Sequence, residues 1–319
     1  MKILITGAGG YIGSNAAQYF DGRGFEVVGT VRDKICGRAR NCGARLVRAD
    51  LRDFASLERL FRWDFDYVIH IAARASDVGR EADFRLENYE AVKRLASLSA
   101  ERGAKRFVYL STADVYGLRD FCGQGEDGLE FDIGAKNFYP KYKILSEIWL
   151  KENLPPEKFS CVRPCVVWGN GDTTITPRVV DFLKKSPFIF YFGKWKGNNR
   201  WPLAHVENVC KTLHAAMILP EAAGRGATVL DSKFTTLKMY YAKIAEQFFP
   251  EKKFREICVP YSLMYPLARL SSALSKDRPL FDPTLYALDT VSRNLDFSNR
   301  RMLEWLGKIG ERETVGGEF

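Results

Sequence analysis

The chain begins with the stretch Met1-Lys2-Ile3-Leu4-Ile5-Thr6-Gly7-Ala8-Gly9-Gly10-Tyr11-Ile12-Gly13, and this stretch decides the fold. Its apolar run predicts a strand that breaks directly into a glycine-rich turn. In such a turn Gly7 permits the tight bend, Gly10 lets a phosphate approach the backbone, and Gly13 lets a helix pack on the sheet. The helix N-terminus presents backbone N–H groups to an anion. Followed by a helix through Phe20 and a strand at 26–31, the pattern indicates a dinucleotide-binding βαβ unit.

Strands and helices alternate through the first half of the chain. The pattern predicts apolar strands at 26–31, 44–47, 67–72, 106–111 and 159–167, and helices at 54–61, 84–102 and 139–151. Such alternation predicts a parallel sheet covered by helices on both faces. The expected fold class is therefore α/β, a doubly wound parallel sheet of the Rossmann type, with residues 1–170 as the dinucleotide-binding domain.

The second half of the chain has a looser pattern. It predicts helices at 176–185, 206–219 and 237–249, and strands at 188–192 and 228–230. We expect residues 171–319 to form mostly a smaller substrate lobe, with some segments returning to the Rossmann sheet. Such a lobe would close over the strand ends, where open α/β sheets bind ligands. The apolar stretch Val259–Ser275 is expected to be lobe core rather than a membrane contact, and the polar tail 310–319 is assigned no structure.

Composition restricts the class of protein. The 319 residues are 46% hydrophobic and 27% charged, as in soluble globular proteins. No apolar run approaches the roughly 20 residues that a membrane span needs, and a strand at the N-terminus leaves no room for a cleavable signal. Seven cysteines without a CxxC pair favour reduced thiols and a cytoplasmic location.

Charge and histidine content narrow the choice of ligands. The net charge of +9 suits an anionic substrate or a basic, soluble surface, and no basic-aromatic cluster indicates nucleic acid. The three histidines are scattered, without carboxylates at ligand spacing, so no metal site is predicted.

Tyr139 and Lys143 form the candidate proton-transfer pair. They are four residues apart on a predicted helix and therefore share one face. An ammonium group beside a phenol favours the phenolate and lowers its pKa from about 10, and an oxidised nicotinamide would lower it further. Tyr139 could then move a proton to or from a substrate oxygen while hydride moves at carbon. Alone, such a pair is more often a solvated helix face, but the glycine-rich turn and the hydroxyls of Ser111 and Thr112 favour catalysis.

Several motifs occur in the order found in one known family. They are TGxxGxxG at 6–13, Asp50-Leu51, HxAA at 70–73, Ser-Thr followed by VYG at 111–117, YxxxK at 139–143 and RPxxVxG at 163–169. Over residues 1–215 the chain resembles the extended short-chain dehydrogenase/reductase family, also called the NAD-dependent epimerase/dehydratase family. The resemblance implies an enzyme that transfers hydride at a hydroxyl or keto carbon.

The same resemblance assigns roles to residues. Thr112, or Ser111, would hydrogen-bond the reacting oxygen, Tyr139 would be the acid/base, and Lys143 would bind the nicotinamide ribose. The expected cofactor-binding residues are Gly7, Gly10, Tyr11, Ile12, Gly13, Arg32, Asp50, Leu51, Ala72, Ala73, Ser111, Tyr139, Lys143, Pro164 and Val166. A homodimer through the helices around 84–102 and 139–151 is expected from the family.

The end of the second predicted strand bears on the choice of cofactor. Members that use NAD commonly carry an acid there to bind the ribose 2′-OH. Here Val31 is followed by Arg32, and a guanidinium suits the 2′-phosphate of NADP, with Lys34 and Arg38 as further basic groups. The run 30–33 also resembles dihydroflavonol-reductase-like members, which use NADPH. NADP is therefore favoured, and NAD remains an alternative in which Asp33 binds the ribose.

The run 111–117 can be compared with the corresponding run of dehydratases in the family. Dehydratases of the family resemble S-T-D-E-V-Y-G, whereas Ala113 stands here in place of the acid, so dehydration is not expected. A nucleotide sugar is the favoured substrate, in a 4-ketoreductase or 4-epimerase reaction. The runs 112–117 and 205–209 are similar to such enzymes, and a diphosphate would suit Arg178, Lys194, Lys196 and Arg200.

Two other functions are left open. The runs 206–209 and 259–267 are similar to 3β-hydroxysteroid-dehydrogenase-like members, which would imply an NADPH-dependent reductase of an apolar ketone. A non-catalytic NADP-sensing protein is the second alternative, although such relatives usually lack the Tyr or the Lys that this chain carries.

Overall fold

The structure is a computed structural model that describes residues 1–32, 43–274 and 283–316. Its centre is a seven-stranded, all-parallel sheet with the strand order β10-β6-β5-β4-β1-β2-β3. The strands are β1 (Lys2–Thr6), β2 (Glu26–Val31), β3 (Arg45–Arg48), β4 (Tyr67–His70), β5 (Arg106–Leu110), β6 (Phe159–Pro164) and β10 (Gly226–Val229). From β1 the chain adds β2 and β3 on one side of the sheet, and then crosses to add β4 on the other side of β1. A ligand crevice is expected at this switch point between β1 and β4.

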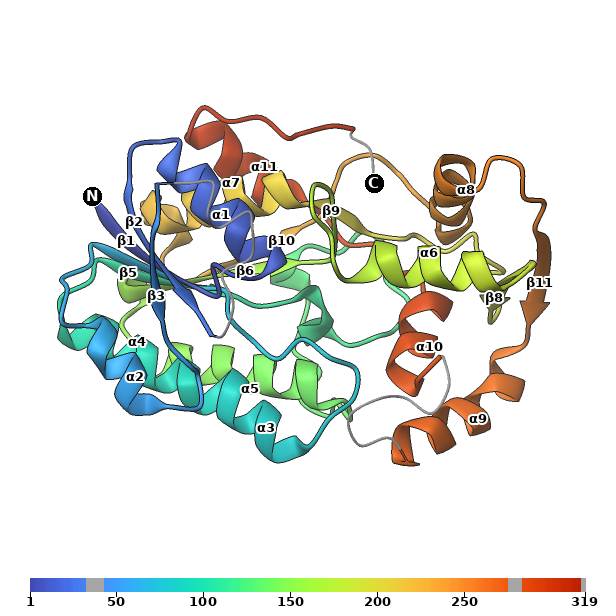
Figure 1. Cartoon of the computed structure of the whole chain (residues 1–319), viewed down its shortest axis with the longest axis horizontal. Helices are drawn as coiled ribbons and strands as arrows, with labels where there is room; N and C mark the ends of the chain where they lie inside the picture. The colour runs from blue at the N-terminus through green and yellow to red at the C-terminus, as the bar shows by residue number, and fades with distance from the viewer. Residues whose placement is uncertain (33–42, 275–282, 317–319) are drawn as a thin grey trace.

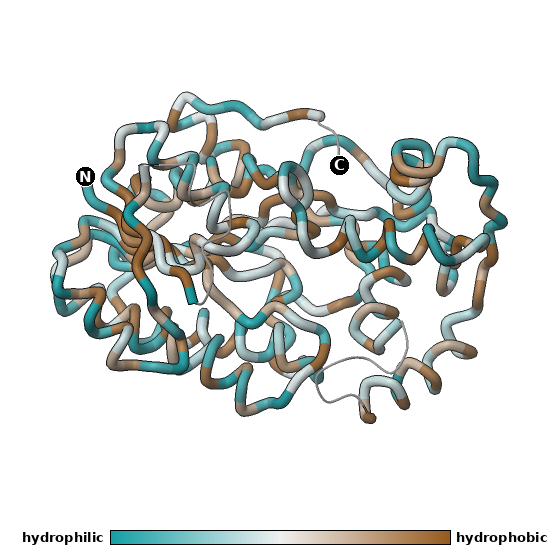
Figure 2. The backbone as a smooth tube through the Cα atoms, in the orientation of Figure 1, coloured by the Kyte–Doolittle hydropathy of each residue, from teal (hydrophilic) through white to brown (hydrophobic). Residues whose placement is uncertain are grey.

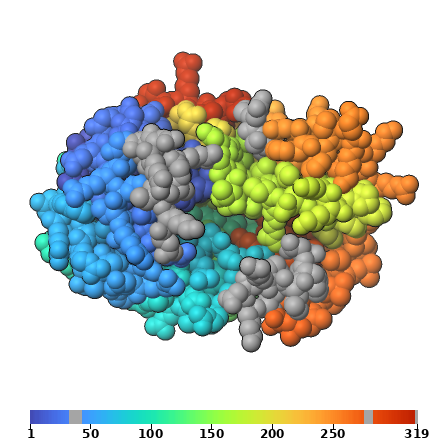
Figure 3. All heavy atoms as spheres, in the orientation of Figure 1, coloured from blue at the N-terminus to red at the C-terminus, as the bar shows by residue number. Residues whose placement is uncertain are grey.

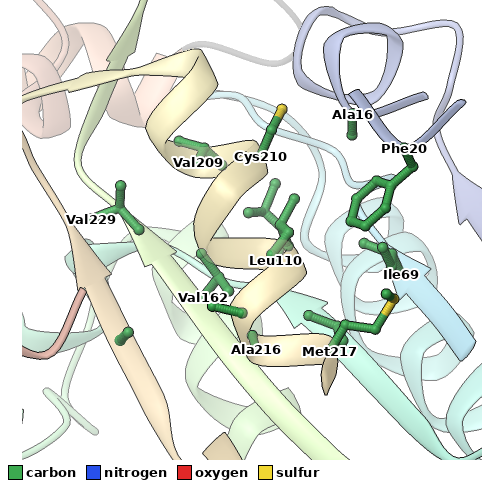
Figure 4. Close-up of a cluster of buried hydrophobic side chains, with 14 of the residues drawn as sticks. Ala16, Phe20, Ile69, Leu110, Val162, Val209, Cys210, Ala216, Met217 and Val229 are labelled. Atoms are coloured by element: carbon green, nitrogen blue, oxygen red, sulfur yellow. The ribbon is translucent and has the colours of Figure 1, made fainter. Parts of the chain in front are cut away.

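Helices cover both faces of the sheet. They bury the apolar side chains that successive strand residues direct to opposite faces, as β1 shows. Ile3 and Ile5 pack in one buried cluster and Leu4 in another. The first face is covered by α1 (Tyr11–Asp21), α7 (Val206–Ile218) and α11 (Arg300–Lys308). Figure 4 shows this packing, with Phe20 of α1 and Met217 of α7 close to Ile69. The second face is covered by α2 (Phe54–Leu60), α4 (Ala91–Glu101) and α5 (Phe138–Asn153).

The remaining elements form a lobe at the other end of the molecule from β1 and β3 (Figure 1). Its buried core joins α6 and α8 to the parallel strand pair β8–β11. The lobe elements are α6 (Ile175–Lys185), β8 (Phe188–Phe192), α8 (Leu237–Phe248), β11 (Arg255–Val259), α9 (Tyr261–Leu274) and α10 (Leu285–Ser292). A second strand pair, β7 (Val166–Trp168) and β9 (Leu203–His205), lies between the lobe and the sheet. The predicted α/β Rossmann fold class is thus confirmed.

Two predicted strands are shorter than expected, because the backbone beyond each of them finds other partners. The strand predicted over 159–167 ends at Pro164, and the chain then crosses to pair with β9 instead of continuing along β5. The strand predicted over 67–72 ends at His70. The Thr6 hydroxyl accepts the backbone N–H groups of Ile71 and Ala72, at 3.1 and 3.2 Å, in place of a ladder partner.

Two helical predictions also need correction. The helix predicted from Phe84 begins at Glu81 as α3 (Glu81–Arg85) and passes through a π-helical turn, Leu86–Glu90, before α4. In the stretch 259–275, expected to be lobe core, the described residues 259–274 form the end of β11 and the helix α9, whose leucines are exposed to solvent. Strands β9 and β11 and helix α10 were not predicted from the sequence.

Candidate active site

A cavity of about 1440 Å³ lies between the carboxyl ends of the strands and the lobe. Figure 3 shows the molecule hollowed between the blue-to-cyan sheet side and the yellow-green α6. The predicted catalytic and cofactor-binding residues all line this cavity: Gly7, Gly10, Tyr11, Ile12, Gly13, Arg32, Asp50, Leu51, Ala72, Ala73, Ser111, Thr112, Tyr139, Lys143, Pro164 and Val166. Asp33, Lys34 and Arg38, named for cofactor choice, lie outside the described residues.

The glycine-rich turn has the geometry that a pyrophosphate needs. Gly7 has a φ of +74°, and a Cβ there would lie 2.9 Å from the Ala72 Cα. A Cβ on Gly13 would lie 2.0 Å from the Gly7 carbonyl oxygen, so only glycine lets α1 begin this close to the turn. The N-cap residue Gly10 brings no side-chain acceptor to the first turn of α1, which opens into the cavity. The turn therefore fits a dinucleotide phosphate.

The candidate catalytic side chains come from two elements. Thr112 follows the end of β5, where it caps a short 3₁₀ helix, Ala113–Tyr116. Tyr139 and Lys143 lie one turn apart on α5, whose start is capped by the Asn137 side chain. Lys143 is only 2% exposed, and its Nζ donates a hydrogen bond to the Leu110 carbonyl oxygen at 2.7 Å. This bond holds the ammonium against the end of β5.

The electrostatics of this pair differ from the sequence expectation. Burial, with a further contribution from the Asp114 carboxylate, raises the pKa of Tyr139 above its usual value, and the contact with Thr112 only partly offsets this. Burial lowers the pKa of Lys143 to about 7, although the charge of Glu147 opposes the change. The Lys143 Nζ lies 6.0 Å from the centre of the Tyr139 ring. The predicted lowering of the Tyr139 pKa by Lys143 is therefore wrong.

A buried ion pair that the sequence analysis missed lies one turn further along α5. The Glu147 carboxylate accepts hydrogen bonds from the Arg163 Nε at 2.9 Å and from its Nη2 at 2.6 Å. Burial raises the pKa of Glu147, but Arg163 outweighs this and holds it below its usual value. The spacing of four residues between Lys143 and Glu147 was the available signal. The Glu147 carboxylate also acts on Lys143, because its charge opposes the lowering of the Lys143 pKa by burial.

The structure also brings Asp114 and Tyr286 to Thr112. The Thr112 hydroxyl donates to the Asp114 carboxylate at 3.0 Å, and the Tyr286 hydroxyl of α10 donates to the same oxygen. Burial raises the pKa of Asp114, and these two hydrogen bonds oppose the change. Tyr286 is far from the other site residues in the sequence, so no spacing pattern could have identified it.

The lobe side of the cavity is mainly apolar. It is lined by Val179, Phe182, Phe190, Phe192, Val259, Met264 and Val291. Of the basic residues proposed for a diphosphate, Arg178 lines the cavity, where it pairs with Asp77. Lys194 pairs with Asp120, and the buried Arg200 donates to the Asp231 carbonyl oxygen. Lys194, Lys196 and Arg200 are not among the residues that line the cavity.

The described residues contain no group of three His, Cys, Asp or Glu side chains that could hold a metal ion. Within the same ranges, no helix has the length and apolar composition that crossing a bilayer requires.

A family model for the NAD dependent epimerase/dehydratase family matches residues 3–229. The chain therefore belongs to this family, and it is an NAD(P)-dependent oxidoreductase or epimerase. The resemblance seen in the sequence is thus confirmed.

Relatives of the chain differ in their substrates. A 4-hydroxy-2-methyl-3-oxo-4-farnesyl-3,4-dihydroquinoline-1-oxide ketoreductase from Stigmatella aurantiaca is 26% identical over 72% of this chain and 67% of its own. A UDP-glucose 4-epimerase from Streptomyces lividans is 40% identical over 36% of this chain and 37% of its own. The structure of the epimerase Mth375 from Methanothermobacter thermautotrophicus covers 99% of this chain and 89% of its own at 19% identity, with a TM-score of 0.74.

Proposed function

We propose that the enzyme reduces a ketone to an alcohol, or catalyses the reverse, with Tyr139 as the proton donor and acceptor. The observation that carries this proposal is that Thr112, Tyr139 and Lys143 line one cavity together with the Gly7–Gly13 turn. When bound at that turn, a nicotinamide cofactor would supply or accept the hydride.

The side chains suit the proton half of the reaction. The raised pKa keeps the Tyr139 phenol protonated at neutral pH, ready to donate to a ketone oxygen that gains hydride at its carbon. Thr112 would position that oxygen by a hydrogen bond, once its hydroxyl proton turns from Asp114 to the ketone. Lys143, which lines the same cavity with its Nζ on the Leu110 carbonyl oxygen, would bind the ribose of the nicotinamide cofactor. A proton returned to Tyr139 would complete the cycle.

The test of this proposal is Tyr139→Phe, with Tyr142→Phe on the same helix as the matched control. Tyr142 donates its hydroxyl to Glu81 instead of lining the cavity. Loss of the proton donor should lower kcat by about 10²- to 10⁴-fold, with cofactor binding retained, whereas Tyr142→Phe should stay within a few fold of the unchanged enzyme. Turnover that survives Tyr139→Phe would refute the role.

We propose an apolar ketone as the substrate, because apolar side chains of β8, α6 and α9 line the lobe side of the cavity. The Stigmatella ketoreductase supports this class. A homologous series of alkyl ketones tests it, since each methylene buried in the lobe should raise kcat/KM by about fourfold, from about 0.8 kcal/mol. A flat series would oppose the proposal.

A nucleotide sugar, the class that the sequence favoured, is the second candidate. It is supported by the run 112–117, by Arg178 in the cavity, and by the 40% identity to a UDP-glucose 4-epimerase over part of the chain. Turnover of UDP-glucose or of a 4-keto nucleotide sugar, with no activity on the alkyl series, would establish this candidate instead.

For the cofactor we propose a preference for NADP over NAD. Arg32 follows the end of β2, where the ribose 2′ position is expected, and it lines the cavity near Asp50. Arg32→Ser should weaken NADPH binding at least about tenfold, or 1.4 kcal/mol, and leave NADH binding unchanged. Arg59→Ser, on the exposed surface of α2, is the control. Tighter binding of NADH than NADPH by the unchanged protein would contradict the proposal.

A further inference from the structure

Helix α9 packs on the lobe through small side chains and exposes its large apolar ones, the reverse of the usual pattern. The residues that it buries completely are small, Ala268 and Ser271, both 0% exposed. Its leucines face outward instead: Leu263 is 65% exposed, Leu267 49%, Leu270 52% and Leu274 59%. When the outer face of a surface helix contacts only water, its large apolar side chains normally face the core. The outer face of α9 is therefore built to contact something apolar.

The four leucines form one continuous stripe, which we call the α9 leucine stripe. Their spacings of four, three and four residues place them on a single face of the helix, which is about 21 Å long. The helix contains no acidic residue, and its one basic residue, Arg269, is also exposed. Figure 2 shows hydrophobic residues along α9 at the outer edge of the lobe. An apolar face without negative charge on a chain of net charge +9 complements an anionic lipid surface.

The stripe is also placed next to the cavity. Met264 of α9 and Val259, just before the helix, line the lobe side of the cavity, whereas Leu263 and Leu267 point outward. Phe182 of α6 lines the same cavity and is 41% exposed. Helix α9 thus lies between the apolar lobe side of the cavity and an apolar outer surface. We propose that the α9 leucine stripe docks this enzyme on the surface of an anionic lipid bilayer.

A second copy of the chain fits the stripe less well. Stable dimers bury roughly 800 Å² on each partner, and four partly exposed leucines on one helix fall well short of that. Lipid imposes no such requirement, because an interfacial helix needs only to sink its apolar face into the headgroup boundary.

Vesicle sedimentation tests the proposal with the full-length protein and without substrate, so the result does not depend on the proposed reaction. The probes are vesicles of phosphatidylcholine and phosphatidylglycerol in equal parts, and vesicles of phosphatidylcholine alone. The protein should sediment with the anionic vesicles, less with the neutral ones, and less at high salt. The double variant L267Q/L270Q should lower the partition coefficient at least about tenfold.

The control is I133Q/M239Q, which removes two other exposed apolar side chains, 83% and 49% exposed, outside α9. It should partition like the unchanged protein. If L267Q/L270Q does not fold, L263Q takes its place, because Leu263 is the most exposed of the four. The proposal is overturned if the unchanged protein stays in the supernatant, if L267Q/L270Q binds vesicles normally, or if light scattering shows a dimer that L267Q/L270Q dissociates.

Discussion

The surroundings of His70 favour the neutral form of its imidazole ring. Its ring is buried and stacks near Phe107 and Tyr109, with ring centres 5.8 and 5.9 Å apart. Because the Thr6 oxygen already accepts two backbone N–H groups, its hydroxyl proton points to the His70 Nδ1, 2.7 Å away. The proton of the neutral ring is then on Nε2. Burial, and secondly the charge of Lys143, lower the pKa of His70 to about 3.

This pKa predicts a loss of stability in acid. In the unfolded chain His70 takes up a proton near pH 6.5, whereas the folded protein resists protonation down to about pH 3. The free energy of unfolding should therefore fall as pH drops below 6.5, by about 2 kcal/mol at pH 5 from this residue alone. Denaturant unfolding at pH 7 and pH 5 measures the loss, and His70→Gln should remove most of it. Parallel pH curves for the two proteins would show that another group is responsible.

At the residue scale, the sequence predicted what depends on local spacing. Tyr139 and Lys143 were found because helical periodicity places them together, and Thr112 because it ends a strand. Tyr286 could not be found, since it lies 172 residues from Asp114 and their contact depends on how α10 packs. The direction of the Tyr139 pKa shift was also missed, because it depends on burial and on the charge of Asp114.

At the scale of elements, the turn between β1 and α1 carries a sharp steric requirement. A Cβ on Gly13 would lie 2.0 Å from the Gly7 carbonyl oxygen, and backbone on both sides cannot easily move. Gly13→Ala should therefore lower the free energy of unfolding by about 1–3 kcal/mol and weaken cofactor binding. Thermal unfolding and a cofactor titration measure the two effects.

Gly307 in α11 provides the matched control for this prediction. A Cβ there meets no atom within 4 Å, so Gly307→Ala should stabilise the protein by about 0.5–1 kcal/mol through the helix preference of alanine. Equal effects of the two substitutions would mean that the close contact between α1 and the turn carries no strain.

Element boundaries were predicted well where the pattern is strong and poorly where tertiary contacts decide. The Rossmann strands and α5 follow from apolar runs and helical spacing. The break at Cys165 between β6 and β7 depends on which strand lies beside the chain, and β7 has a different neighbour from β6. Helix α9 was misjudged because its leucines predict a buried face, and nothing local shows that they face outward.

At the scale of the whole molecule, the lobe is tied to the sheet side across the cavity by a few polar contacts. Asp77, in the loop after β4, accepts a hydrogen bond from Thr284 at 2.7 Å and pairs with Arg178 of α6 at 3.3 Å. Thr284 caps the start of α10 and is fully buried. Since α6 and α10 both line the cavity, Asp77 helps to set its width.

Asp77→Ala should therefore loosen the lobe more than it disturbs the chemistry. It removes one buried hydrogen bond and one partly exposed ion pair, worth together about 1–3 kcal/mol, while Tyr139, Thr112 and Lys143 keep their own partners. We expect KM to rise up to about tenfold with a smaller change in kcat, and limited proteolysis in the lobe to become faster. Asp77→Asn retains an acceptor for Thr284 and should give an intermediate result, whereas Asp64→Ala, at an exposed position, should change neither measurement. A large loss of kcat at unchanged KM would place Asp77 in the proton-transfer machinery instead, because a residue that only holds the two halves together acts on substrate capture.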